Sequence, residues 1–117
     1  MKISEYKKHA KVVSKYGNKK TLYGDRLYDS KKEAHRAIIL DVLQKKGIIK
    51  SWEPQFVIKA IINDTAVFRY IADFRVTYPD GRIEIEDVKP EFTKKLPLYR
   101  LKKKCLKALY NIDIVEI

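Results

Sequence analysis

The stretch VTYPDGRIEIEDVKP, residues 76–90, decides how the middle of this chain folds. The residues PDG at 79–81 are typical of a tight turn, and the segments on both sides read as β-strands. Strands joined by so short a turn pair antiparallel. If the turn is the three-residue loop 79–81, Tyr78 pairs with Arg82, and the residue numbers of opposed pairs sum to 160.

This register predicts that Asp73 lies opposite Asp87. Side chains on one face of the second strand are Ile83, Ile85, Asp87 and Lys89, whereas Glu84, Glu86 and Val88 point to the other face. Opposed side chains have Cβ atoms about 4.5 to 5.5 Å apart, and like charges there destabilise a sheet. A divalent cation between the two carboxylates would remove the repulsion and create a binding site.

The chemistry that fits two carboxylates and a lysine is phosphodiester hydrolysis. Asp73 and Asp87 would hold Mg²⁺, with Mn²⁺ expected to substitute, and Lys89 would orient or activate the attacking water. A plain alternative is that Asp87 and Lys89 form an exposed ion pair, worth less than about 1 kcal/mol. The opposed Asp73 and the charge of the whole chain favour the site.

The surrounding sequence predicts a mixed α/β fold. A hairpin is expected at 21–28 around Gly24 and Asp25, followed by a largely buried helix from Ser30 to Gly47. Strands at 48–60, 66–78 and 82–89, a helix at 95–110 and a last strand, IDIVEI, follow. The last strand should run parallel to 82–89, which gives the order αβββαβ with helices flanking a mixed sheet.

Composition points to a polyanionic partner. The 117 residues carry 26 Lys and Arg against 15 Asp and Glu, a formal net charge of +11, which favours nucleic acid. No apolar run is long enough to span a membrane, so a membrane partner is not expected. The chain has a single cysteine, Cys105, which excludes an internal disulfide and suits a reducing cell interior. Cys105 is expected to be a small residue of the protein core.

The segments YIADFRV and IEDVKP, joined through PDG, resemble the PD-(D/E)XK nuclease superfamily. The similarity extends from about Tyr28 to Ile117, and the chain resembles in particular small phage and prophage nucleases and the endonuclease subunit of heteromeric transposases. It implies a restriction-endonuclease-like fold and a Mg²⁺-dependent site. Ala72 stands where the family usually has proline, and the second acid, Asp87, is Asp rather than the commoner Glu.

The resemblance also assigns individual residues. Asp73 matches the motif aspartate, Asp87 the second acid and Lys89 the motif lysine. Glu33 matches an acid that many members contribute from the first helix, although it also stands three residues after Ser30 as in a capping box. Gln55 lies where relatives often carry a glutamine near the site; its alternative is a strand surface residue.

Basic residues outside the motif predict the nucleic-acid contacts. The predicted helix at 95–110 has an apolar stripe at Leu98, Leu101, Cys105, Ala108 and Leu109 and a basic side opposite. The expected phosphate contacts are Lys94, Lys95, Arg100, Lys103, Lys104 and Lys107, together with Lys19 and Lys20 of a basic N-terminal arm at 1–20. No base-reading helix is evident, so recognition by backbone and shape is expected.

The sequence thus predicts a single domain over 1–117, with a catalytic core at 28–117, that acts as a Mg²⁺-dependent DNA endonuclease. Branched DNA such as a Holliday junction suits so small a domain, and cutting two strands would favour a homodimer. A cytoplasmic location and a phage genome as source fit this interpretation. The alternative is a nucleic-acid-binding protein that keeps the fold without catalysis.

Overall fold

The computed structural model describes residues 20–117, so Lys19 and nearly all of the predicted N-terminal arm lie outside the described residues. The chain divides into two compact units, one ending at Lys46 and the other comprising Gly47–Ile117. No helix within residues 20–117 has the length and apolar character needed to cross a membrane. That the whole chain acts as one domain, with its catalytic core at 28–117, stays a prediction.

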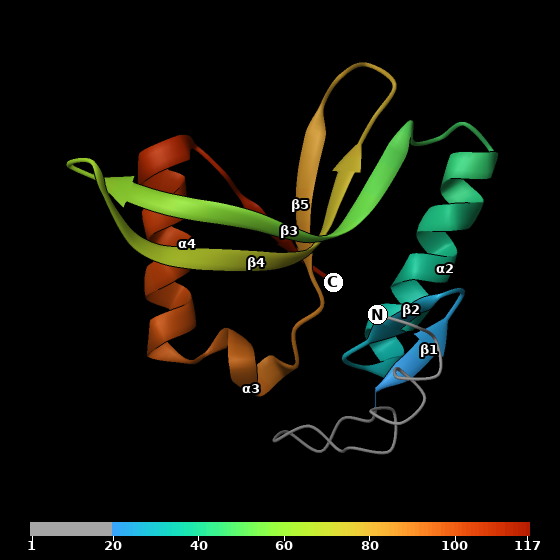
Figure 1. Cartoon of the computed structure of the whole chain (residues 1–117), viewed down its shortest axis with the longest axis horizontal. Helices are drawn as coiled ribbons and strands as arrows, with labels where there is room; N and C mark the ends of the chain where they lie inside the picture. Colours follow the sequence, from blue (N-terminus) through green and yellow to red (C-terminus); the bar gives the residue numbers. More distant parts are fainter. Residues whose placement is uncertain (1–19) are drawn as a thin grey trace. The chain divides into compact units, whose positions relative to one another are not determined.

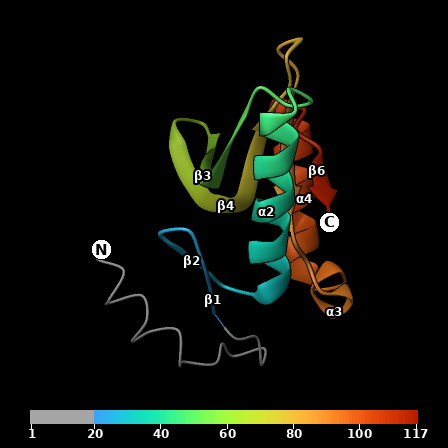
Figure 2. The same ribbon diagram turned by 90° about the vertical axis from the view of Figure 1, so that its right-hand side faces the viewer.

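The first unit contains a short hairpin and a helix (Figures 1 and 2). Strands β1 (Thr21–Tyr23) and β2 (Arg26–Tyr28) pair antiparallel across Gly24 and Asp25, as the spacing predicts. Helix α2 (Lys31–Lys45) begins after Ser30, whose Oγ accepts a hydrogen bond from the backbone N of Glu33 at 3.0 Å. The predicted capping of this helix by Ser30 is therefore confirmed.

The expectation that α2 is largely buried is wrong. Its buried apolar residues, Ala34, Ala37 and Leu40, follow one stripe, while Ile38, Ile39 and Val42 are 36–45% exposed. Among the described residues of its unit, the helix packs against the two strands of the short hairpin. Because so small a ribbon covers one side of a helix, apolar residues around the rest of the circumference stay in solvent.

The second unit is a mixed α/β fold around a four-stranded sheet in the order β3-β4-β5-β6. The strands are β3 (Ser51–Ile62), β4 (Thr65–Thr77), β5 (Ile83–Asp87) and β6 (Ile114–Glu116). Strands β3, β4 and β5 form an antiparallel meander, and β6 pairs parallel to β5 after a helical crossover. The predicted element order and pairing directions are confirmed.

The predicted register between β4 and β5 is also confirmed. Phe74 pairs with Glu86 and Thr77 with Ile83, so opposed numbers sum to 160. The N–H of Tyr78 donates to the carbonyl of Arg82 at 2.8 Å, which closes the three-residue turn. Gly81 there has φ +91°, a conformation that glycine adopts without a steric cost.

Two helices lie between β5 and β6: a single turn, α3 (Glu91–Lys94), and α4 (Pro97–Tyr110). Helix α4 packs against the sheet and forms the core of the unit with strands β3 to β6 (Figure 1). That core comprises Ile58, Tyr70, Ala72, Ile85, Tyr99, Leu106 and Ile114.

The helix α4 does not bury the predicted apolar stripe. Tyr99 and Leu106 are buried, whereas Leu98 and Leu101 are 63% and 58% exposed. Two tyrosines hold this orientation: the buried Tyr99, whose hydroxyl group needs a hydrogen-bond partner, and Tyr110, which is 41% exposed. Tyr99 donates to Glu116 of β6, and Tyr110 donates to the carbonyl of Lys59 on β3.

Candidate functional site

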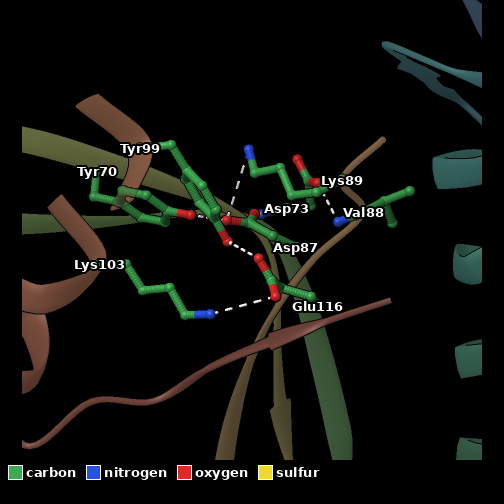
Figure 3. Close-up of polar contacts among 8 residues, drawn as sticks. All are labelled: Tyr70, Asp73, Asp87, Val88, Lys89, Tyr99, Lys103 and Glu116. Atoms are coloured by element: carbon green, nitrogen blue, oxygen red, sulfur yellow. Dashed lines mark hydrogen bonds and ion pairs between the residues drawn. The ribbon is translucent and has the colours of Figure 1, made fainter. Parts of the chain in front are cut away.

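The two aspartates meet where the pairing of β4 with β5 ends. One residue beyond the last pair, Phe74–Glu86, the backbone N of Asp73 donates to Asp87 Oδ1 at 2.8 Å. The backbone N of Val88 donates to Asp73 Oδ2, also at 2.8 Å (Figure 3). Each carboxylate thus accepts a backbone N–H from the opposite strand, which offsets the repulsion expected between opposed like charges. Asp73 and Asp87 are brought together as the register predicts.

Asp87 is the most buried ionisable group of this site, with 0% of its surface exposed. Its Oδ2 accepts a hydrogen bond from the hydroxyl of Tyr70 on β4. Burial raises the pKa of Asp87 to about 6, against the lowering effects of the Lys89 charge and of the Asp73 backbone N–H. This carboxyl group therefore changes protonation state just below neutral pH.

Lys89 joins the aspartates just beyond the end of β5. Its Nζ lies 3.8 Å from Asp87 Oδ2, and its side chain is 22% exposed. The same ammonium group lies 5.2 Å from the ring centroid of Tyr99, a cation–π distance. The lysine is held between the buried carboxylate and an aromatic face and still reaches solvent.

Glu116 is a neighbour of the site that the sequence argument did not single out. It pairs with Asp87 across the parallel β5–β6 ladder. Its carboxylate accepts a hydrogen bond from Tyr99 at 2.7 Å and a salt bridge from Lys103 at 3.3 Å. Burial acts to raise the pKa of Glu116, but the Tyr99 hydrogen bond and Lys103 outweigh it, so the pKa falls below its usual range.

A sequence signal for Glu116 was present. The order Ile112, Ile114, Glu116 repeats on the last strand the order Ile83, Ile85, Asp87, with an acid two residues after two alternating isoleucines. Tyr70 and Tyr99 gave no such signal. The role of Tyr70 depends on which strand its hydroxyl group reaches from β4, and the role of Tyr99 depends on how α4 packs against the sheet.

Gln55 lies on β3 at the same level of the sheet as Asp73, Asp87 and Glu116 on the other three strands. The pairs on either side are Pro54–Phe74 and Phe56–Ala72, so Gln55 falls opposite Asp73. Its φ of +54° marks a local irregularity in the strand. Gln55, Asp73, Asp87 and Glu116 therefore occupy one row across the four strands. A role of Gln55 in supporting the aspartates stays a prediction.

Glu33 lies in the other unit. Its side chain is buried, with 4% of the residue exposed, and its backbone N is capped by Ser30. This bond is the Ser30 half of a capping box, while the contribution of the Glu33 side chain to the cap and its membership in the metal site both stay predictions.

Most of the predicted basic contacts lie on α3, on α4 or between these helices, whereas Lys20 lies in the first unit. Four of these lysines have carboxylate partners: Lys94 with Glu91, Lys103 with Glu116, Lys107 with Asp113 and Lys20 with Asp29. Lys95, Arg100 and Lys104 are exposed. Helix α4 thus presents a basic side next to Glu116.

The donor chemistry of Asp73 and Asp87 suits Mg²⁺. Oδ1 of Asp87 accepts one hydrogen bond, from Asp73, and keeps a second lone pair. Within residues 20–117, no group of three or more His, Cys, Asp or Glu is arranged to hold a metal ion. Mg²⁺ is commonly bound by one or two carboxylates and completes its shell with water and phosphate oxygens, so two aspartates meet its needs.

A family model described as "Protein of unknown function (DUF1064)" matches residues 13–114. No curated protein and no solved structure matches the chain. The matched range covers the aspartate pair, Lys89 and all of α4.

Proposed function

We propose that this chain, which belongs to the DUF1064 family, is a Mg²⁺-dependent endonuclease with a restriction-endonuclease-like core. The observation that carries the proposal is the pairing of Asp73 with Asp87 beside the half-buried Lys89. Two carboxylates and a lysine at the end of adjacent strands, in a chain of net charge +11, match the needs of phosphodiester hydrolysis.

Each residue of the site has a separate role in the proposed hydrolysis. Asp73 and Asp87 would hold the cation, which when bound lowers the pKa of a water ligand and neutralises charge on the phosphate. Lys89 would orient the attacking water and stabilise negative charge on the phosphate oxygens. Tyr70 fixes the Asp87 carboxylate, and the Tyr99 ring positions the Lys89 ammonium group.

The substrate class follows from charge and from the resemblance to PD-(D/E)XK nucleases. DNA is the proposed substrate, bound through its phosphates by the basic side of α4. A single small site cuts one strand at a time, so cleavage of a duplex or a Holliday junction would need a homodimer. Mn²⁺ would replace Mg²⁺.

Replacing Asp87 with Asn tests the proposal, since Asn keeps the shape but loses the charge. We expect wild type with Mg²⁺ to cleave labelled duplex or four-way-junction DNA. Asp87→Asn should reduce the rate by about 100-fold or more while binding persists. A matched control is Glu84→Gln, because Glu84 lies on the same strand and bonds Tyr78 and Arg82 instead of the aspartates.

The alternative function is nucleic-acid binding without catalysis, which the basic side of α4 would serve equally well. Tight DNA binding with no cleavage by wild type, across duplex, junction and single-stranded substrates with Mg²⁺ and Mn²⁺, would favour this alternative and reject the nuclease.

A further inference from the structure

A hollow of about 350 Å³ lies between α4 and the edge strand β6. Its wall is formed by Lys94 of α3, four basic residues and Tyr99 of α4, and the segment around β6. The charged residues that line it are Lys94, Arg100, Lys103, Lys104, Lys107, Asp113 and Glu116. Among the described strands, β6 pairs with β5 alone, so the hollow lies along an edge of the sheet.

The charge of this hollow fits an anion. Five cationic side chains face two carboxylates, which leaves a net charge of +3 on the lining. Lys103 and Lys107 are bridged to Glu116 and Asp113, whereas Arg100 and Lys104 have no carboxylate within salt-bridge distance among residues 20–117. Two cations are thus available to a ligand, and an arginine can bind phosphate through two parallel hydrogen bonds.

The size of the hollow favours single-stranded over double-stranded nucleic acid as its ligand. Its volume lies in the range of sites that take one small-molecule group, such as a nucleotide. A double helix can present its phosphates to the rim of such a hollow, but its stacked and paired nucleotides cannot turn into it without unpairing. A single strand, or the end of a strand, can enter.

The hollow is adjacent to the aspartate pair. Glu116 lines it and is also the cross-strand neighbour of Asp87, and neighbouring strands lie about 4.8 Å apart. Figure 3 shows Lys103 and Tyr99 joined to the Glu116 carboxylate, and Asp87 joined to Tyr70 and Lys89 on the neighbouring strands. A strand with one phosphate at Asp73 and Asp87 could therefore place a nearby phosphate in the hollow.

We propose that this hollow binds a phosphate group of single-stranded nucleic acid, with Arg100 and Lys104 as its main contacts. The inference deepens the proposed nuclease function and rests on it for its biological meaning. The phosphate is either an internal diester of the strand or a monoester at its end, and both bind through the same contacts.

The test measures binding of a labelled single-stranded oligonucleotide to the full chain in EDTA, so that no cleavage is needed. Arg100→Gln and Lys104→Gln should each weaken binding by about three- to tenfold at low salt. Lys102→Gln is the matched control: it removes the same charge from the same helix, but Lys102 lies over the Phe68 ring and does not line the hollow. We expect it to weaken binding by less than about twofold.

Two further arms identify the source of the phosphate. A larger loss for oligonucleotides with a 5′- or 3′-phosphate than for those with hydroxyl ends indicates a monoester, whereas equal losses indicate an internal diester; either supports the hollow. Equal weakening by all three variants would overturn the inference, because it would mean that only total charge matters. If wild type binds more tightly than Arg100→Gln and Lys104→Gln in EDTA and yet cleaves no substrate with Mg²⁺, that result would reject the nuclease and leave the hollow as a binding site.

Discussion

Among single residues, Asp87 should have the clearest effect on how the stability of the fold depends on pH. Its folded-state pKa of about 6 lies above the ordinary value of 3.8, so the folded protein binds more protons between these values than the unfolded chain. The resulting stabilisation is fully present below about pH 4 and is lost as pH rises through about 6. Without metal, burying the charged form therefore costs stability at neutral pH.

Comparing the pH dependence of stability of wild type with that of Asp87→Asn isolates this effect. Asn does not titrate, and the titration of Glu116 affects the stability of both proteins. The free energy of unfolding of wild type minus that of the variant should fall by about 2–3 kcal/mol from pH 4 to pH 7 in EDTA. Urea unfolding at several pH values measures it. A difference that is constant with pH would contradict the burial of an ionising Asp87.

The role proposed for Tyr99 predicts different results for its ring and its hydroxyl. Tyr99→Phe keeps the ring beneath Lys89 and should lower the single-turnover cleavage rate by less than about threefold. Tyr99→Leu loses the ring and should lower the rate about tenfold, with substrate affinity nearly unchanged. Equal losses in both variants would show that the hydrogen bond to Glu116, rather than the ring, positions the lysine.

At the scale of elements, the β4–β5 turn fixes the register that joins the aspartates. Gly81 has φ +91° and open space around its Cα, so substitution there costs backbone strain without a steric clash. Gly81→Ala should lower the free energy of unfolding by about 1 kcal/mol, and Gly81→Asn by less, because Asn tolerates positive φ better. Thermal unfolding gives the order; an alanine variant as stable as wild type would argue against this turn.

The same elements show what the sequence can and cannot predict. The PDG turn fixed the pairing of Asp73 with Asp87 because a short loop leaves few registers, and that local information is complete in the sequence. The rotation of α4 was not predictable in this way. Its exposed Leu98 and Leu101 look like core residues by periodicity, but the partners found by Tyr99 and Tyr110 lie on distant strands. Tyr70 and Tyr99 joined the site for the same non-local reason, whereas Glu116 had a signal in the alternating pattern of the last strand.

At the scale of the whole molecule, net charge governs the proposed affinity for nucleic acid. With a formal charge of +11, binding should release counterions from several phosphates. If about five phosphates are bound, the logarithm of the association constant should fall linearly with the logarithm of the salt concentration, with a slope of about −4.5 on duplex DNA. A salt titration measures the slope; a value shallower than about −1 would mean that the basic side of α4 does not contact the backbone.

The central claim is that Asp73 and Asp87 together hold one divalent cation. Titration of the full chain with Mn²⁺, followed by electron paramagnetic resonance of the free ion, tests it most directly. Wild type should bind one Mn²⁺ in competition with Mg²⁺, and Asp73→Asn and Asp87→Asn should each lose that site while Glu84→Gln keeps it. Mn²⁺ binding that is unchanged in both aspartate variants, or no saturable binding to wild type, would contradict the account.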